Sequence, residues 1–262
     1  LLKLVDDSSA ALRKEAWTGL AMLAGDSDLG PMTKASTRIK DDKEQGFALA
    51  AVKRAFSRAK DKEVSFNGIA EHFDSSNDVT KGLVLDLAAD VGSKRALELE
   101  RKALESNNEE LRQKAIRALA DWANATASDD LLKLATGAKA NRDRILALRG
   151  YIRIAGMDGA GISSAERTAM FKQADSIATR LEEKRLIVGN LRNAGTPEAL
   201  TMLIGYMKDN SLKQEAELSA ADLIWNLRLI RSDKVMKLAE ELTGSSNKAV
   251  AQKARACLAD MN

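Results

Sequence analysis

A repeated segment constrains this chain more than any other feature of its sequence. Eight segments align without gaps, and their starting positions are separated by 29 to 40 residues, with a mean of 34. The segments begin at Leu12, Glu44, Val79, Leu111, Asp143, Glu183, Leu212 and Val250. Self-similarity at a period of roughly 20–50 residues is typical of stacked supersecondary units. We therefore expect a fold in which one structural unit occurs about eight times.

Two columns of this alignment predict the buried face of the repeated segment. The fifth column reads Ala16, Ala48, Leu83, Ala115, Ala147, Ile187, Ala216 and Ala254. The ninth column reads Leu20, Val52, Leu87, Leu119, Tyr151, Leu191, Ala220 and Leu258. Positions four apart lie on the same face of an α-helix, so the two columns form one apolar stripe. The alanines of the fifth column would let a neighbouring helix approach closely.

The composition indicates that helices form the whole fold. Aromatic residues make up 4% of the chain and proline occurs twice, whereas the frequent alanine, leucine, lysine, arginine and glutamate are strong helix formers. A β-sandwich or β-barrel would require more β-branched and aromatic residues. A shorter apolar segment, as at residues 1–5, 131–135 and 235–239, precedes the longer one. We predict an all-α, right-handed α-solenoid of about eight antiparallel helix pairs, forming a single domain over residues 1–262.

Helix boundaries are also visible in the sequence. Thr196-Pro197 and Gly30-Pro31 are typical of helix starts, because proline is tolerated in the first turn. Five residues near the fourteenth column are expected to close helices in the left-handed conformation. They are Gly25, Gly92, Asn124, Gly156 and Gly195.

The pattern resembles the HEAT-repeat family. A polar turn followed by the segment 108–119 is similar to the second helix of such a repeat, and the resemblance covers nearly the whole chain. The sets of residues that mark tetratricopeptide and ankyrin repeats do not recur here. Residues 141–209 are similar to HEAT-type regions of large exported bacterial proteins. That resemblance implies a location outside the cytoplasm in preference to one inside it. Residue 1 is leucine within an apolar pattern, so we expect a fragment of a longer chain.

Residues suited to catalysis or metal binding are few. His72 is the only histidine, which excludes a metal site built from several histidines. Cys257 lies beside the apolar stripe and is predicted to be a buried thiol. The glycine-rich stretch 156–164 lacks the order of a phosphate-binding loop, and we expect Ser163 or Ser164 to begin the next helix with help from Glu166. We predict no catalytic residue, no metal and no cofactor.

An arginine stripe is the best candidate for a binding surface. On the face opposite the apolar stripe, the segments of the central repeats carry Arg117, Arg149, Arg153, Arg185 and Arg192. Residues 141–195 contain ten basic and six acidic residues. Guanidinium groups bind carboxylates in pairs of hydrogen bonds, so the stripe could receive an acidic peptide. The alternative is a solvated face whose charge is partly neutralised by ion pairs with Asp121 or Glu183.

The three tryptophans differ in their positions. Trp17 and Trp122 fall in columns that predict packing inside the molecule. Trp225 takes the place where other segments end, and its helix is expected to continue through residues 226–228. It either packs against the last repeat or anchors a ligand.

These features favour a non-catalytic protein-interaction or scaffold module whose second helices line a concave groove. The partner would be another protein or a neighbouring domain of the same polypeptide. One alternative is a nucleic-acid-binding or DNA-repair protein, although a formal charge of +3 disfavours it. Another is a structural spacer in a larger exported protein. No apolar run reaches the length of roughly 18 residues that a membrane span needs, so membrane insertion is not expected. The oligomeric state is left open.

Overall fold

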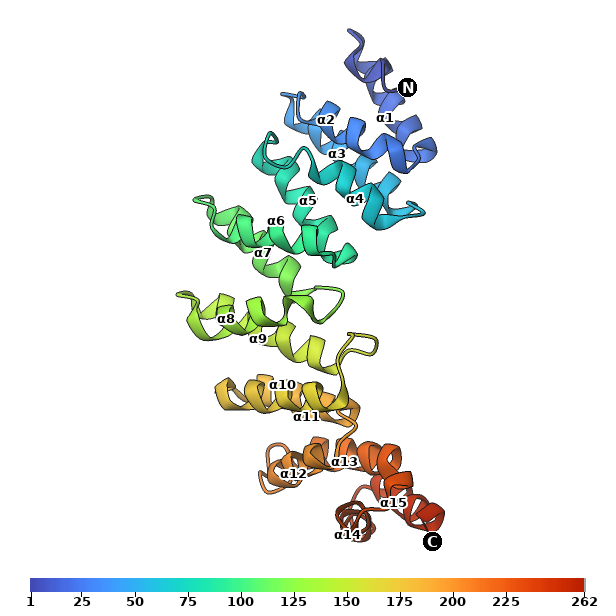
Figure 1. Ribbon diagram of the computed structural model, residues 1–262, viewed down its shortest axis with the longest axis vertical. Coiled ribbons are helices and arrows are strands. Elements are labelled where there is room, and N and C mark those ends of the chain that lie inside the picture. Colours follow the sequence, from blue (N-terminus) through green and yellow to red (C-terminus); the bar gives the residue numbers. More distant parts are fainter. Residues whose placement is uncertain (262) are drawn as a thin grey trace. The chain divides into compact units, whose positions relative to one another are not determined.

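The fold is all-α, as the composition predicts. The computed structural model describes residues 1–261, and within that range it contains helices and no strand (Figure 1). The α-helices are α1 (Ala10–Leu23), α2 (Leu29–Ser36), α3 (Asp42–Ser57), α4 (Lys62–Ala70), α5 (Asp78–Val91), α6 (Lys94–Leu104), α7 (Glu109–Ala120), α8 (Ser128–Gly137), α9 (Asn141–Gly156), α10 (Ser164–Ile177), α11 (Leu181–Asn190), α12 (Pro197–Tyr206), α13 (Lys213–Leu227), α14 (Asp233–Leu242) and α15 (Lys248–Met261).

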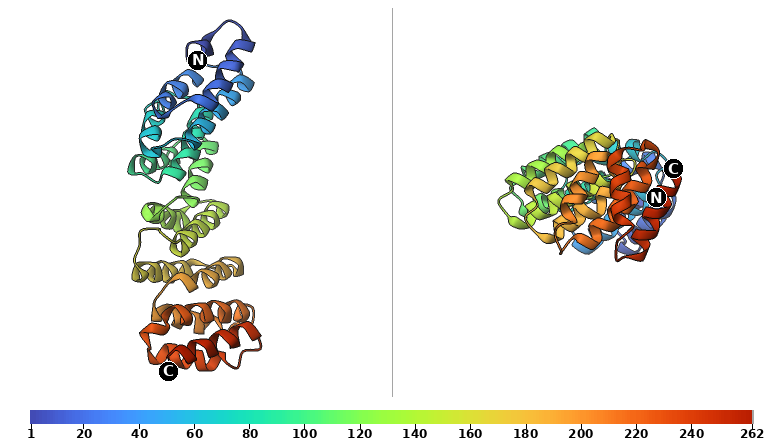
Figure 2. Two further views of the ribbon diagram at one scale, coloured as in Figure 1. Left: turned by 90° about the vertical axis from the view of Figure 1, so that its right-hand side faces the viewer. Right: turned by 90° about the horizontal axis from the view of Figure 1, so that it is seen from below.

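The helices form two compact units. The first unit is Leu1–Thr126 and holds α1 to α7. The second unit is Ala127–Asn262 and holds α8 to α15. In each unit, odd-numbered helices pack on one another, as α1 does on α3 and α13 on α15. Each odd-numbered helix from α3 onward also packs on an even-numbered neighbour. Figure 2 shows α10 to α15 as successive layers of helices within the second unit.

The eight aligned segments coincide with the odd-numbered helices α1 to α15. Each of these helices begins within two residues of the start that the alignment gives. All eight residues of the fifth column are buried. In the ninth column only Leu258, on the last helix, is partly exposed. The predicted apolar stripe is therefore the face through which the odd-numbered helices pack.

Several predicted helix boundaries are confirmed. Thr196 accepts a hydrogen bond from the amide of Ala199, and Pro197 is the first residue of α12. Ser163 and Glu166 form a capping box at the start of α10. Gly92 has a left-handed φ of 64° and Gly195 one of 69°.

The prediction of a left-handed residue was wrong at Gly25, Asn124 and Gly156. Gly25 is extended, with a φ of −97°. Gly156 is the last residue of α9, and Asn124 is not left-handed. The first apolar segment also differs from expectation, because it forms only a short 3₁₀ turn, η1 (Leu4–Asp6).

At Asn124 the difference arises because α7 already ends at Ala120, and at Gly156 because the carbonyl group is capped from a later part of the chain. Asn124 Nδ2 donates to the carbonyl of Gly92 at 3.0 Å, and Asn193 Nδ2 donates to that of Gly156 at 2.9 Å. A guanidinium nitrogen of Arg58 donates in the same way to the carbonyl of Ala21. These donors satisfy carbonyls that have no partner within their own helix, so a left-handed residue is not needed at Gly156. At Gly92 the side-chain donor and the left-handed conformation occur together.

The first unit contains one buried carboxyl without a partner. Glu100, on α6, is 0% exposed, and neither of its carboxylate oxygens has a hydrogen-bond partner. Burial raises the pKa of Glu100 well above its usual range, and the nearby charge of Asp86 raises it further. The protonated carboxyl is the form that suits this environment, because an unpaired buried charge is costly.

We predict that Glu100→Leu stabilises the protein by about 2 kcal/mol at pH 7, because it removes an unsatisfied buried acid. The folded-state pKa lies above the unfolded value of about 4.3, so the penalty grows as the pH rises from that value toward the folded pKa. The gain should therefore shrink toward acidic pH. Urea unfolding across the pH range measures it. Glu98→Leu, at an exposed position of the same helix, is the control. A gain independent of pH would contradict the assignment.

Candidate functional site

The predicted arginines lie on the odd-numbered helices or directly after them. Arg117 lies on α7 in the first unit. In the second unit, Arg149 and Arg153 lie on α9, Arg185 on α11, and Arg192 in the 3₁₀ turn η4 (Leu191–Asn193) that follows α11. Four of the five residues therefore share one unit, and the site is built from those four.

Arg149 forms an ion pair with a buried carboxylate. Its Nε lies 2.8 Å from Oε1 of Glu183, and its terminal nitrogen lies 2.7 Å from the same oxygen. The Glu183 side chain on α11 is 2% exposed, and Arg180 Nε lies 3.6 Å from its other oxygen. The two guanidinium groups thus neutralise a buried carboxylate where α9 packs on α11. The Arg149 side chain itself is 43% exposed, so it reaches the buried carboxylate from the surface of the unit.

Arg185 and Arg192 are more accessible. Arg185 Nε lies 3.3 Å from a carboxylate oxygen of Glu215, with half of the arginine side chain exposed. Arg192 is 56% exposed and lies 3.6 Å from Asp222, which also pairs with Lys253 at 2.6 Å. Arg153 is half-buried and has interactions of its own.

These contacts belong to a wider pattern of inter-helix ion pairs. Each joins one odd-numbered helix to the next, as α11 to α13 through Arg185 and Glu215. In the first unit, Arg13 on α1 binds Glu44 on α3 at 2.6 Å, and Lys114 on α7 lies 3.3 Å from Asp86 on α5. The Arg13 guanidinium holds the pKa of Glu44 below its usual range. The pairing of Arg149 with Glu183 agrees with the expectation that ion pairs neutralise part of the arginine stripe.

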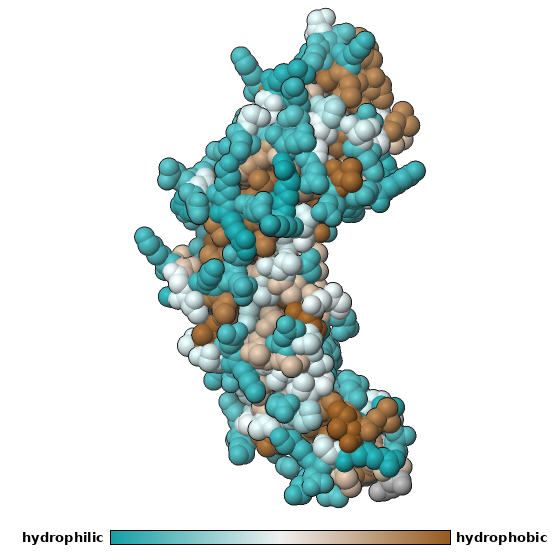
Figure 3. Space-filling model, viewed as in Figure 1, coloured by the Kyte–Doolittle hydropathy of each residue, from teal (hydrophilic) through white to brown (hydrophobic). Residues whose placement is uncertain are grey.

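A pocket lies beside the buried Glu183. It has a volume of about 410 Å³. Residues on either side of the turn between α8 and α9, together with the turn between α10 and α11, line it. Its polar residues include Asn141, Arg144, Thr179 and Arg180. Arg144 and Arg180 are exposed. The alignment could not single them out, because they precede or border the aligned segments. In the view of Figure 3, hydrophilic residues share the visible surface of the second unit with residues of intermediate hydropathy and with hydrophobic ones.

Trp225 is half-buried at the end of α13. The guanidinium of Arg228 lies 4.4 Å from the centre of its ring, and Arg228 Nε binds Asp260 on α15 at 2.8 Å. The helix continues as a 3₁₀ turn, η5 (Arg228–Ile230), as the sequence predicts. Leu229, 78% exposed, was not predicted as part of this surface. The alignment could not identify Leu229, because no other aligned segment has a residue at the corresponding position.

The remaining predicted residues have structural surroundings. Trp17, Trp122 and Cys257 are each 0% exposed, which confirms that they pack inside the molecule. Burial raises the pKa of the Cys257 thiol. His72 is half-buried just beyond the end of α4. Among residues 1–261, no group of three or more His, Cys, Asp or Glu side chains is placed to hold a metal ion. Over the same range, no helix is both long and apolar enough to cross a membrane.

Comparisons with known proteins add little. No family model matches the chain, and no curated protein does. A crystal structure of an engineered protein from the Northeast Structural Genomics Consortium is 17% identical, with 99% of this chain and 94% of that chain covered. Its TM-score is 0.25, which is too low to support an inference about this chain.

We predict that Arg149→Met lowers the free energy of unfolding by about 2 kcal/mol, because it leaves the buried carboxylate of Glu183 with only the more distant Arg180. Arg185→Met is the matched control. Its pair with Glu215 is about half exposed, and such pairs contribute at most about 1 kcal/mol. Urea unfolding followed by circular dichroism compares the two variants. Equal losses would show that Arg149 is an ordinary surface arginine.

Proposed function

We propose that the chain is a HEAT-like, right-handed α-solenoid of about eight antiparallel helix pairs that form a single domain. The proposal is supported by the spacing of its long-range polar contacts. Arg13 binds Glu44, 31 residues away; Asp26 accepts from the amide of Lys60, 34 residues away; and Lys234 donates to Thr201, 33 residues away. Contacts spaced near the sequence period of 34 are what stacking of each unit on the next would produce.

We further propose that this domain is a non-catalytic protein-interaction or scaffold module. The observation that carries this proposal is the placement of Arg185 on α11 and of Arg192 in the turn η4 that follows it, each at least half exposed. Exposed residues of successive odd-numbered helices would form one extended surface in a solenoid. Such a surface suits a partner that lies across several helices.

An acidic segment of a protein is the partner whose chemistry fits. A guanidinium group has five N–H donors, and the ion pairs with Glu215 and Asp222 leave several of them available. These donors can bind carboxylates two at a time. Such a segment could belong to another protein or to a neighbouring domain of the same polypeptide. Arg149 is a poor probe of this surface, because its loss would disturb the packing of α9 on α11.

We predict that the double substitution Arg185→Ala and Arg192→Ala raises the dissociation constant of a labelled oligoglutamate peptide about tenfold. Binding should weaken as salt is added, because the contacts are exposed charges. Fluorescence anisotropy with the full chain measures both effects. Lys172→Ala with Lys237→Ala is the matched control, since it removes the same charge from exposed positions on the even-numbered helices α10 and α14.

Two results would contradict the proposal. If the control lowers binding as much as the arginine substitutions do, the attraction is a general effect of charge. If duplex DNA binds more tightly than the peptide, with a steep loss of affinity in salt, the nucleic-acid alternative is favoured.

A further inference from the structure

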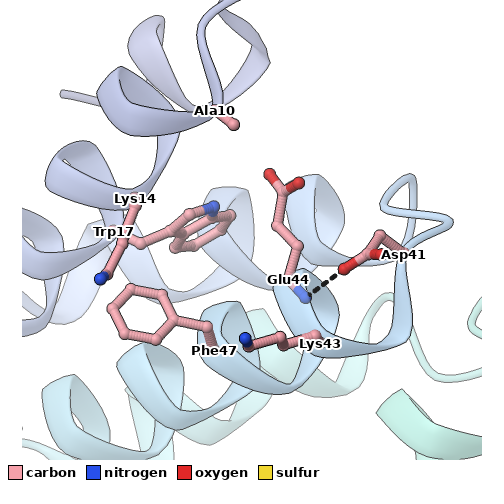
Figure 4. A pocket seen from close by; sticks show the side chains of 7 residues that line it. All are labelled: Ala10, Lys14, Trp17, Asp41, Lys43, Glu44 and Phe47. Carbon is pink, nitrogen blue, oxygen red and sulfur yellow. Dashed lines mark hydrogen bonds between the residues drawn. The ribbon is translucent and has the colours of Figure 1, made fainter.

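A pocket between α1 and α3 of the first unit lies outside the arginine surface. Its volume is about 310 Å³, at the lower end of the range of roughly 300–1,000 Å³ for ligand pockets. The residues that line it are Ala10, Lys14, Trp17, Asp41, Lys43, Glu44 and Phe47 (Figure 4). In Figure 4 the ring of Phe47 lies beside the indole of Trp17, with the ammonium group of Lys14 near both rings. The wall of the pocket is therefore largely aromatic, with charged groups around it.

The indole of Trp17 provides a hydrogen-bond donor that the chain itself does not use. Trp17 is 0% exposed, and its Nε1 has no hydrogen-bond partner. Trp122 is equally buried, yet its Nε1 donates to the hydroxyl of Thr126 at 3.0 Å. Buried indole N–H groups normally have an acceptor, and an unsatisfied one is costly. The Trp17 N–H therefore indicates that an acceptor from outside the chain belongs here.

The charges of the pocket indicate the kind of acceptor. Both oxygens of Glu44 are bound by Arg13, at 2.6 and 2.8 Å. Asp41 accepts from the backbone amide of Glu44 at 2.8 Å and so caps α3. Lys14 and Lys43 are exposed, and neither forms an ion pair with the residues that the structure describes. The acids of the pocket are thus occupied, whereas its two ammonium groups are available.

We propose that this pocket binds a carboxylate attached to an apolar body. The apolar part lies against Trp17 and Phe47, and the carboxylate accepts from Trp17 Nε1 and pairs with Lys14 or Lys43. Two sources share this chemistry, namely a free aromatic or aliphatic acid and the C-terminal residue of a peptide. The proposal does not depend on the arginine surface, since it concerns other residues in the other unit.

A cationic ligand fits the same residues less well. Two aromatic rings beside two acids can bind a quaternary ammonium group. Here, however, Glu44 is already neutralised by Arg13, and Lys14 and Lys43 would repel a cation. A cation would also leave the Trp17 N–H without an acceptor.

Access to the indole requires a small rearrangement at the rim. Trp17 is closed to solvent, but Phe47 is 38% exposed and both lysines are exposed. Exposed side chains change rotamer within nanoseconds. A ligand oxygen can reach Nε1 only when motion of this kind opens the rim.

The indole N–H signals of the ¹⁵N-labelled full chain provide a direct test. Trp122→Phe and Trp225→Phe each remove one of the three signals, so the Trp17 signal is assigned without substitution of Trp17. Phenylacetate should shift that signal downfield in a saturable manner, with a dissociation constant on the order of 1 mM. Phenylacetamide, which has the same shape without the charge, should bind at least fivefold more weakly. Lys14→Met with Lys43→Met should remove the difference between the two compounds.

Further titrations determine whether the ligand is a peptide C-terminus or a small acid, and whether it is an anion or a cation. A short peptide that ends in phenylalanine is compared as the free acid and as the C-terminal amide. If the free-acid peptide binds more tightly than phenylacetate, the pocket recognises a peptide end; if phenylacetate binds more tightly, it recognises a small acid. No shift of the Trp17 signal with either acid would overturn the proposal. So would equal binding of phenylacetate and phenylacetamide, or a saturable shift with choline in place of the acids.

Discussion

The burial of small side chains where the odd-numbered helices meet determines the rest of this structure. Ala48, Ala115 and Ala147 are each 0% exposed at the same position of three different helices. Alanine lets helix axes approach to the short end of the usual range of about 8–10 Å. No single helix can bury such a stripe by itself, so each helix depends on its neighbours for a core. The polar contacts between helices are secondary to this packing and refine it.

Two buried glutamates show how differently such an interface can treat a charge. Glu183 lies where α9 packs on α11 and is held by two guanidinium groups, so its carboxylate is compatible with burial. Glu100 is equally inaccessible, but no donor contacts it. The difference lies in the neighbours and not in the depth of burial. Arg149 on α9 and Arg180, directly before α11, are the partners of Glu183, whereas Asp86 near Glu100 contributes a repulsive charge.

The repeating helices could be predicted from the sequence, but the contacts that one repeat makes with the next could not. The aligned columns predicted the odd-numbered helices and their buried face, because both follow from the spacing of side chains along one helix. Helix ends were harder. Gly156 was expected to end its helix by its own conformation, whereas Asn193 caps it from 37 residues away. Likewise, the position of Trp17 in the repeat predicted its burial. Whether the indole N–H has a hydrogen-bond acceptor depends on the neighbouring helix α3.

The same limit applies to the arginine stripe. Arg149 and Arg185 occupy comparable places on the outer face of their helices, and helical periodicity treats them alike. They differ in the acid on the next helix, because Arg149 binds the buried Glu183 whereas Arg185 binds the partly exposed Glu215. The part that each arginine plays in the packing is therefore set by the residue opposite it, about one period later in the chain.

The side-chain caps at the helix ends act in the same sense along the chain, because a later residue donates to an earlier helix. Where a later side chain donates to an earlier helix, as Asn124 does to Gly92 and Asn226 does to Arg192 at 3.4 Å, the acceptor is a backbone carbonyl and the donor is a flexible amide. If the donor segment detaches, its amide is readily hydrated, but the earlier helix loses the partner of its last carbonyls. When the chain unfolds locally, the segment before the unfolded part should therefore lose more stability than the segment after it. The order of the chain, and not only its composition, then decides which end of a unit frays first.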